Sequence, residues 1–329
     1  MLADPARPLL EVRDLVTHFT RRVGFLGTQR EVVQAVNGVS LDVARRETLG
    51  LVGESGCGKT TLGRTILRLV ERTSGAVRFD GQDVFALDAA ALRRLRRRMQ
   101  IVFQDPDGSL NPRQSIGRAV REGLEVHHLA HGPEAGRKVE ALLDEVGLPA
   151  GSAARYPHEL SGGQRQRAGI ARALAVEPEF VLCDEPVSAL DVSVQAQVLN
   201  LLADLQARRG LSYLFISHDL AVIRHIAPRV AVMYLGRIVE QGPSDAIYRR
   251  PQHPYTQALL TAVPVPDPAT RRQRVVLAGD PPSPVNPPPG CPFHPRCQHP
   301  GKDATCRTVR PELRALEPGH LAACHLAGR

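Results

Sequence analysis

The sequence is poor in lysine and contains no long apolar run. Of its 42 lysine and arginine residues only three are lysines, Lys59, Lys138 and Lys302. No stretch approaches the 18 or so uncharged apolar residues that a membrane-spanning helix requires. The first residues also lack the apolar segment of a secretory signal. The sequence therefore predicts a cytoplasmic protein whose contact with any membrane is made through a partner.

Aromatic residues are also scarce, at 4% of the chain, and this bears on the basic charge. The net charge is +8, and part of it comes from a run of arginines between residues 93 and 98. Such a run can bind nucleic acid or an anionic membrane surface. No aromatic side chain interleaves it to stack on bases, so the pattern favours a solvated or ion-paired helix face. We expect no nucleic-acid partner.

The composition changes after about residue 250. A chain of 329 residues suggests one large domain with an appendage, or two domains. Residues 264–289 are rich in proline, which is typical of an extended linker, and a short tail rich in cysteine and histidine follows. We predict a main domain over residues 9–250 and an extension over residues 251–329.

The main domain has the pattern of an α/β protein. We expect core strands at residues 99–103, 180–185 and 211–217, with a helix at 192–209. Strands that alternate with helices predict a parallel sheet with ligands at the carboxyl ends of its strands. Residues 9–20 and 31–43 predict an antiparallel β subdomain, with a turn at Asn37–Gly38. Helical periodicity predicts a helical insert at about residues 106–163.

The main functional motif is Gly53-Glu54-Ser55-Gly56-Cys57-Gly58-Lys59-Thr60, between an apolar strand pattern and a helical pattern through Leu69. It fits the phosphate-loop pattern G-x-x-x-x-G-K-[ST]. The glycines let backbone N–H groups surround a phosphate, Lys59 reaches the β- and γ-phosphates, and the Thr60 hydroxyl can bind Mg²⁺. Because this chain uses arginine almost wherever a cation suffices, a lysine here favours a nucleotide site over a chance match.

The nucleotide site is predicted to extend slightly beyond the motif. The residues predicted to contact nucleotide in and next to the loop are Gly53, Glu54, Ser55, Gly56, Cys57, Gly58, Lys59, Thr60 and Thr61. The ring of Phe19, which lies 34 residues before Gly53, could stack on the adenine base. A lone phenylalanine in a strand is more often part of the core, and the sequence leaves both possibilities open.

Two further segments supply candidate catalytic groups. Asp184 and Glu185 end an apolar strand, where an aspartate beside a phosphate loop can hold Mg²⁺ and a glutamate can deprotonate the attacking water. His218 directly follows the next strand and can contact the γ-phosphate. An Asp-Glu pair alone is weak support for a metal site, but the phosphate loop upstream favours this interpretation.

A second anion site is predicted at Leu160-Ser161-Gly162-Gly163-Gln164. A small hydroxyl and two glycines open a helix expected at residues 165–175, so backbone amides can again bind an anion. One chain needs only one such site for its own nucleotide. The second is therefore predicted to bind the ATP of a different chain.

Taken together, these motifs resemble those of the ATP-binding cassette (ABC) family. The matching segments are residues 53–60, Gln104, residues 160–164, Asp184-Glu185, residues 188–191 and His218. The resemblance implies an ATPase that forms a head-to-tail dimer, with each ATP between one subunit's Lys59 loop and the other's Ser161-Gly162-Gly163 turn. It also implies that Gln104 links the Mg²⁺ site to the helical insert, Glu185 is the general base, His218 holds the γ-phosphate and Asp191 lies at the dimer seam.

A narrower resemblance is to the ATPase subunits of dipeptide and oligopeptide importers, in the peptide/nickel group. Residues 50–63, 156–167, 232–241 and 253–260 carry it. It implies a second ATPase subunit (a paralogue), two transmembrane permease subunits and a solute-binding protein, with this chain at the inner face of the plasma membrane. The cargo stays open between peptides, a nickel chelate and glutathione. An exporter or a nucleic-acid-acting ABC ATPase is disfavoured by the detached tail, the single phosphate loop and the short insert.

The six cysteines fall into two groups. Cys57 and Cys183 are predicted to be structural. Spacing leaves zinc, an iron–sulfur cluster and unligated thiols open for the tail group, Cys291, Cys297, Cys306 and Cys324. The importer resemblance implies a four-cysteine [4Fe–4S] cluster there, with Zn²⁺ as the alternative.

Overall fold

The computed structural model describes residues 7–23, 29–261, 277 and 279–328. The chain forms two compact units. We call the first the loop unit; it contains Leu10–Asp42, Thr48–Phe85 and Ser217–Arg329. The second, the helical unit, consists mainly of Ala86–Ile216, together with Val43–Glu47. Much of the predicted proline-rich linker lies outside the described residues.

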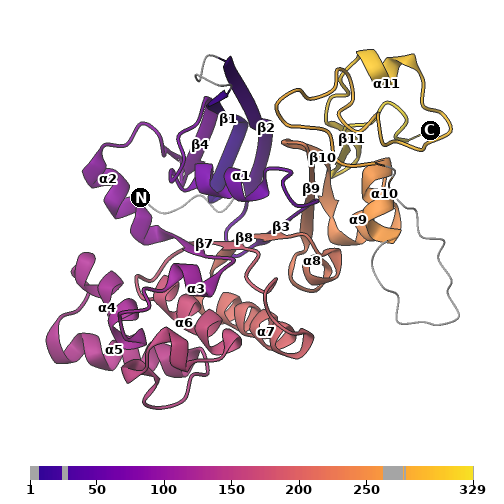
Figure 1. Cartoon of the computed structure of the whole chain (residues 1–329). Helices are drawn as coiled ribbons and strands as arrows, with labels where there is room; N and C mark the ends of the chain where they lie inside the picture. Colours follow the sequence, from indigo (N-terminus) through magenta and orange to yellow (C-terminus); the bar gives the residue numbers. More distant parts are fainter. Residues whose placement is uncertain (1–6, 24–28, 262–276, 278, 329) are drawn as a thin grey trace, which may run out of the picture. The chain divides into compact units, whose positions relative to one another are not determined.

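The loop unit contains an antiparallel sheet with the strand order β2-β1-β4-β5, drawn in Figure 1. Its strands are β1 (Leu10–Val23), β2 (Gln29–Val43), β4 (Ser74–Phe79) and β5 (Gln82–Asp83). The predicted antiparallel β subdomain is therefore present, but the turn expected at Asn37–Gly38 is wrong. The strand β2 continues through Gly38, whose left-handed φ of 72° is available to glycine without strain. The N–H of Asn37 donates to the carbonyl of Gly236 instead of closing a turn.

A second set of strands in the loop unit leads to the phosphate loop. The strands are β3 (Thr48–Val52), β9 (Arg229–Tyr234), β10 (Arg237–Pro243), β11 (Arg314–Glu317) and β12 (His320–Ala322). β3 pairs in parallel with β9, and β9 forms an antiparallel hairpin with β10. β12 pairs antiparallel with β10, and β11 pairs with β12. The C-terminal extension therefore adds strands to this sheet, which the sequence analysis did not predict.

The loop unit also contains short helices, some of which pack on its strands. They are α1 (Lys59–Ile66), α8 (Leu220–Ile226), α9 (Ser244–Arg249), α10 (Pro254–Thr261) and α11 (Ala304–Thr308). α1 packs on β1, and α8 packs so closely on β3 that a Cβ at Gly50 would lie 2.6 Å from Ile223. The sequence pattern extended α1 to Leu69, which is wrong. Arg68 has a φ of 51°, which ends the helix and leaves Leu69 exposed.

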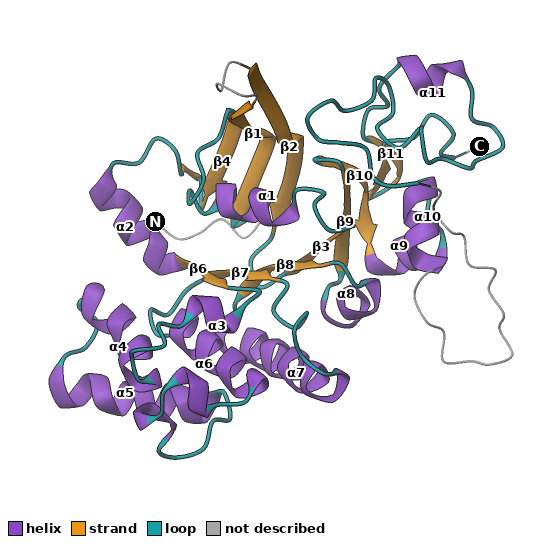
Figure 2. Ribbon diagram, viewed as in Figure 1, coloured by secondary structure: helices purple, strands orange, loops and turns teal. Residues whose placement is uncertain are grey.

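The helical unit contains three parallel strands and most of the helices (Figure 2). The parallel strands are β6 (Met99–Val102), β7 (Phe180–Asp184) and β8 (Ser212–Ser217). The helices are α2 (Ala89–Arg98), α3 (Pro106–Ser109), α4 (Ile116–Val126), α5 (Gly132–Glu145), α6 (Gly162–Leu174) and α7 (Val192–Arg209), with 3-10 turns η1 (Ser152–Ala154) and η2 (Pro157–Glu159). α6 packs against α3, α4, α5 and α7. The predicted parallel core and helical insert are both present.

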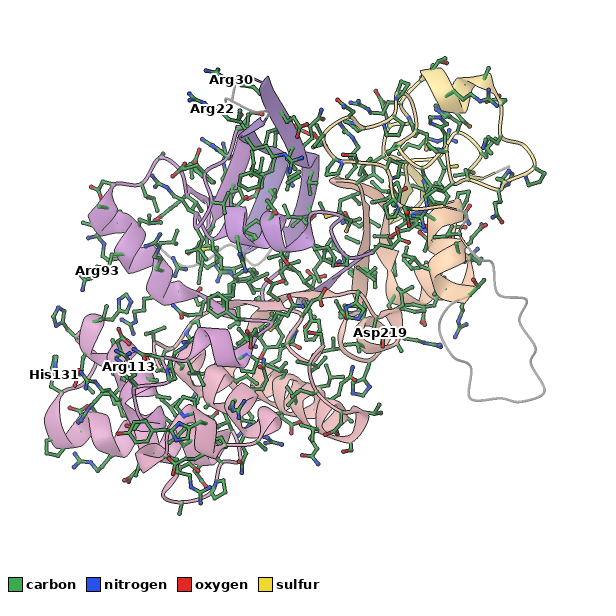
Figure 3. The ribbon with its side chains drawn as sticks, in the orientation of Figure 1. Arg22, Arg30, Arg93, Arg113, His131 and Asp219 are labelled. Carbon is green, nitrogen blue, oxygen red and sulfur yellow. The ribbon has the colours of Figure 1, made fainter. Side chains whose placement is uncertain are left out.

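The arginine run lies on α2, where several side chains have partners in the same unit. Arg98 binds the carboxylate of Glu179 through two hydrogen bonds, and Arg97 lies 3.3 Å from Glu177. Arg93, labelled in Figure 3, donates to the carbonyl of Val126 over 3.0 Å. These contacts agree with an ion-paired helix face. In the described part of the chain, no helix is both long enough and apolar enough to span a membrane.

Candidate functional site: a phosphate loop and a second helix N-terminus

The phosphate loop joins the buried strand β3 to α1, as the sequence predicts. Two of its glycines are required by close backbone contacts. A Cβ at Gly53 would lie 2.2 Å from the carbonyl oxygen of Met233, and one at Gly58 would lie 2.1 Å from that of Ala35. Gly58 also has a left-handed φ of 106°. Side chains are therefore excluded at these positions, and the backbone turns tightly into the helix.

Lys59 lies at the base of this loop with only 4% of its surface exposed. Its Nζ donates to the carbonyl oxygens of Gly53 over 2.7 Å and of Glu54 over 3.0 Å. The ammonium group therefore lies within the loop that it closes. Thr60 and Thr61 follow in the first turn of α1, where the positive end of the helix dipole favours an anion. This geometry suits a polyphosphate.

Glu54 has partners that the sequence analysis missed. Arg296 binds both of its carboxylate oxygens, over 2.6 and 3.1 Å, although the two residues lie 242 positions apart. The Glu54 N–H also donates to the hydroxyl of Tyr255 over 2.8 Å. The rings of Tyr255 and Tyr234 pack against Phe293. The extension therefore supports the phosphate loop directly, and no spacing rule in the sequence could have revealed this contact.

In the helical unit, the structure brings Gln104 and Glu185 together. The Nε2 of Gln104 donates to Glu185 Oε2 over 3.2 Å. Glu185 has a left-handed φ of 46°, and its N–H donates to the carbonyl of Ile216 over 3.0 Å. Asp184, the last residue of β7, is 1% exposed. The strand end thus presents carboxylate and amide oxygens, the donor type that Mg²⁺ prefers.

The predicted second anion site forms the N-terminus of α6, which begins at Gly162 rather than at residue 165. Ser161 caps the helix: its Oγ accepts from the Gln164 N–H, while Gln164 Oε1 accepts from the Ser161 N–H. The cap is a reciprocal capping box. A Cβ at Gly163 would lie 2.4 Å from Val194 Cγ1, so the first turn of α6 packs closely on α7.

Asp191 caps the neighbouring helix α7. Its Oδ1 accepts hydrogen bonds from the Val194 N–H over 2.9 Å and from the Ser193 hydroxyl over 2.7 Å. These hydrogen bonds, the one from Val194 above all, lower the pKa of the Asp191 carboxyl. Gly162 lies next to Leu190, since a Cβ there would be 3.6 Å from its Cδ2. The structure therefore places the Ser161 turn and the Asp191 segment side by side.

The two remaining predicted nucleotide contacts belong to the loop unit. His218 follows β8 and is exposed. Phe19 lies in β1 with 41% of its surface exposed, so its ring is not part of the core. An exposed ring is compatible with stacking on a base, and this role stays a prediction.

Comparison with known proteins identifies the family. Residues 36–188 match the family model described as "ABC transporter", and residues 239–306 match "Oligopeptide/dipeptide transporter, C-terminal region". A putative peptide import ATP-binding protein of Brucella ovis is 54% identical over 317 residues, which cover 96% of this chain and 97% of that protein. The oligopeptide transport ATP-binding protein AppF of Bacillus subtilis is 50% identical over 99% of both chains. The chain belongs to the ABC transporter family.

A solved structure of another ABC ATPase has the same fold. It is the dimeric, post-hydrolysis state of the ATP-binding cassette MJ0796 bound to ADP and Pi. The TM-score is 0.63 at 28% sequence identity, over 71% of this chain and 98% of that one. The α/β fold with an ABC-type nucleotide-binding domain is therefore confirmed, and the chain is an ATPase of this family.

The four tail cysteines of this ABC ATPase lie in one region but come from separate turns. Cys291, Cys306 and Cys324 are buried, and the Cys291 N–H donates to the carbonyl of Cys306 over 2.9 Å. Burial, with smaller additions from the neighbouring thiols, raises the pKa of Cys291 to about 11. Within the described ranges, no three His, Cys, Asp or Glu side chains are placed to hold a metal ion. The arrangement of the described residues therefore gives no support to the predicted [4Fe–4S] or Zn²⁺ site.

The extension is fixed to β10 by Glu240, another residue that the sequence analysis missed. This glutamate is fully buried. It accepts hydrogen bonds from the N–H groups of Gln252 and His253, over 2.7 and 2.9 Å, and lies 2.8 Å from His320 Nε2. The only sign of these contacts in the sequence was an acidic residue within an otherwise apolar strand pattern. Buried polar groups of this kind must be paired, so Glu240 defines how the extension folds onto β10.

Proposed function

We propose that the chain is the ATP-hydrolysing subunit of an ABC importer for dipeptides and oligopeptides. The proposal rests on one observation above all: residues 239–306 match the oligopeptide/dipeptide transporter C-terminal region. This match includes Glu240 and the N–H groups of Gln252 and His253 that it binds. The relatives named for peptide import are similar over nearly the whole chain, which supports the same activity. The main domain is assigned to residues 9–250, with a helical subdomain at about 106–163, and the extension to residues 251–329.

The proposed mechanism uses two copies of the ATPase fold. Each ATP is bound by the Gly53–Thr61 segment of one subunit and by the Ser161-Gly162-Gly163 turn of the other, with Gln164 and Asp191 beside that turn. This arrangement explains why one chain carries two anion-binding helix N-termini. ATP binding closes the dimer, and hydrolysis allows it to open. Phe19 stacks on the adenine.

Hydrolysis is assigned to the groups at the strand ends. Mg²⁺ would be held by Thr60, Gln104 and Asp184, whose oxygen ligands suit it, and would neutralise phosphate charge. Glu185 takes a proton from the attacking water, and Gln104 orients its carboxylate. His218 holds the γ-phosphate through hydrogen bonding.

The partners follow from the proposed transport cycle. They are a second ATPase subunit (a paralogue) and two transmembrane permease subunits supplied by a solute-binding protein. The chain acts in the cytoplasm, at the inner face of the plasma membrane. The ion-paired arginines of α2 give no support to a nucleic-acid partner.

Transport in cells tests the proposal. A strain that lacks this chain should lose uptake of a labelled dipeptide. The wild-type gene should restore uptake, and a Lys59→Ala gene expressed at the same level should not. Labelled nickel chelate and labelled glutathione are measured in parallel, because loss of either one alone would assign the transporter to that cargo. Undiminished dipeptide uptake in the deletion strain would reject a role in peptide import.

The iron–sulfur cluster implied by the importer resemblance stays a prediction for Cys291, Cys297, Cys306 and Cys324. Iron, sulfide and zinc contents of anaerobically purified protein decide between the possibilities. Four iron and four sulfide atoms per chain would support a [4Fe–4S] cluster, and one zinc ion per chain would support a zinc site. Protein without iron, sulfide or zinc would support free thiols.

A further inference from the structure

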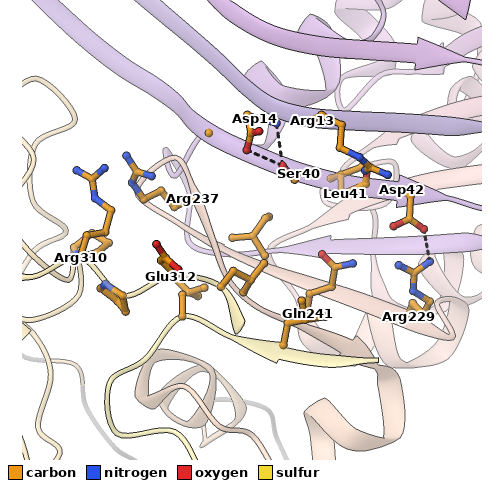
Figure 4. A pocket seen from close by; sticks show the side chains of 18 of the residues that line it. Arg13, Asp14, Ser40, Leu41, Asp42, Arg229, Arg237, Gln241, Arg310 and Glu312 are labelled. Carbon is orange, nitrogen blue, oxygen red and sulfur yellow. Dashed lines mark hydrogen bonds and ion pairs between the residues drawn. The ribbon is translucent and has the colours of Figure 1, made fainter. Parts of the chain in front are cut away.

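The loop unit contains a cavity of about 710 Å³ that the ATPase mechanism does not use. It is lined by residues of β1 and β2, by residues of β9 and β10, and by the part of the extension around β11 and β12. Figure 4 shows the charged side chains that line it, including Arg237 and Arg310. The cavity therefore forms where the extension meets the antiparallel sheet, and residues 53–61 of the phosphate loop do not line it.

Most charges in this cavity are matched by neighbours. Arg229 lies 3.1 Å from Asp42, and the hydroxyl of Ser40 donates to Asp14 over 3.1 Å, as the dashed lines in Figure 4 indicate. Arg13 also has partners, since it donates to the carbonyl of Leu41 and lies 3.7 Å from Glu11. These groups need no ligand to compensate their charge.

Arg237 and Arg310 differ from the other arginines. Throughout the part of the chain that the structure describes, neither guanidinium forms a hydrogen bond or an ion pair. Arg237 is half-buried. Burial, and then the positive charge of Arg310, lower the pKa of Arg237 to about 10. Two cations thus face the same cavity at a cost in free energy, because each raises the energy of the other.

The remaining walls define the kind of molecule that would fit. Ile238, Leu321 and Pro292 supply apolar surface. Glu312 also lines the cavity but pairs with neither Arg237 nor Arg310 among the described residues, so it does not neutralise them. A small organic molecule typically binds in a cavity of this size, with an apolar wall for its body and a few polar groups that orient it.

We propose that this cavity binds a small organic anion, whose carboxylate or phosphate group lies between Arg237 and Arg310. Arginine suits this role because its planar guanidinium presents several donors to the oxygens of such a group. The bound anion would neutralise the mutual repulsion of the two arginines. It would also join β10 to the extension, because the two residues come from these two parts of the chain.

Thermal unfolding and calorimetry test the proposal with inorganic phosphate and butyrate as probes. Both are measured in the full chain carrying Lys59→Ala, so that the phosphate loop does not contribute to phosphate binding. At least one probe should bind and raise Tm. Arg310→Gln should weaken binding by roughly 10- to 100-fold, the loss expected for hydrogen bonds to a charged group. Arg237→Gln should do the same, and Arg237→Lys should restore part of the affinity.

The variants also make a prediction without any anion. In anion-poor buffer, Arg310→Gln should leave Tm unchanged or raise it, because it removes a repulsive charge from an exposed position. Arg249→Gln, which removes an exposed arginine elsewhere in the loop unit, is the control and should change neither binding nor Tm. Phosphate binding alone would assign a phosphate ligand, and butyrate binding alone a carboxylate. Failure of both probes, or binding that survives both glutamine variants, would overturn the proposal.

Discussion

The side chain and the backbone of Glu185, the proposed general base, are both held by hydrogen bonds. The carboxylate is held by the Gln104 amide, and the backbone N–H is held by Ile216. Replacing the carboxylate with an amide of the same shape keeps the packing and removes the base. This residue therefore offers a clean separation of ATP binding from hydrolysis.

We expect Glu185→Gln to bind ATP as the wild type does and to lose about 10²–10⁴-fold in turnover, the usual contribution of a general base. Binding is measured with a fluorescent ATP analogue and turnover by phosphate release. Glu71→Gln, which alters an exposed glutamate of the loop unit, is the control. Normal hydrolysis by Glu185→Gln would show that another group activates the water.

His253 has an environment that makes stability depend on pH. It is fully buried just before α10, and its Nδ1 accepts from the Tyr255 N–H. Burial lowers its pKa from 6.5 to about 3. Between these values the unfolded chain binds a proton that the folded chain does not, so stability falls as the pH decreases from about 6.5 towards 3.

His253→Asn keeps an acceptor for the Tyr255 N–H and removes the titration. The variant should therefore lose part of the pH dependence between about 6.5 and 3, up to about 1.4 kcal/mol per pH unit. Urea unfolding at several pH values gives the slope. His225→Asn, at an exposed histidine of α8, should keep the wild-type slope. Identical slopes in His253→Asn and the wild type would show that His253 does not control the pH dependence.

At the scale of elements, the close contact between α6 and α7 fixes the position of the Ser161 turn, the predicted second anion site. The backbone of Gly163 is helical, a conformation that alanine adopts without strain. The obstacle is Val194, whose Cγ1 would lie 2.4 Å from the new Cβ. The Cβ of Val194 itself would be 3.7 Å away, which is ordinary contact.

Gly163→Ala should therefore displace the Ser161 turn and reduce ATPase activity by roughly 10²-fold, as small displacements of catalytic groups do. ATP binding to the phosphate loop should be unchanged. The double variant Gly163→Ala/Val194→Ala should recover most of the activity, and Val194→Ala alone is the control. Equal loss in the single and double variants would exclude this contact as the cause.

Local sequence patterns predicted most elements, because their signals lie within a few residues. The Arg-rich helix and the helix at residues 192–209 both appear as expected. The two wrong predictions, the turn at Asn37–Gly38 and the end of α1 at Leu69, both involve residues with a positive backbone φ. Glycine tolerates the positive φ at position 38, so β2 continues through it, whereas the positive φ of Arg68 ends α1 early. Neither angle follows from hydrophobic periodicity.

At the scale of the whole molecule, sequence motifs predicted the candidate site residues but not the distant residues that contact them. Phosphate-loop chemistry requires specific residues in consecutive positions, so Lys59 and its neighbours are visible in the sequence. The Arg296–Glu54 pair spans 242 positions, and the Glu240 contacts join β10 to both ends of the extension. Such pairs form only when distant parts of the chain pack together. No pattern of neighbouring residues in a single sequence indicates them.

The Arg296–Glu54 pair predicts that the extension contributes to ATP affinity. Arg296 is 6% exposed, so Arg296→Met should leave the Glu54 carboxylate without its cation beside the bound phosphates. We expect weaker ATP binding and a stability loss of up to about 3–5 kcal/mol, the usual range when one partner of a buried pair is removed.

A double-mutant cycle measures this coupling. Adding Glu54→Gln to Arg296→Met removes the unpaired carboxylate and should restore part of the ATP affinity. Arg307→Met, at an exposed arginine of α11, is the control for the extension. ATP affinity equal to that of the wild type in Arg296→Met would show that the pair serves folding alone.

The position of Arg296 near the end of the chain also affects biosynthesis. A ribosome completes Glu54 early but adds its partner Arg296 only after more than two hundred further residues. During that interval the nascent phosphate loop lacks one of its native contacts. Incomplete translation products that stop before the extension should therefore compete poorly for ATP and for assembly with finished subunits.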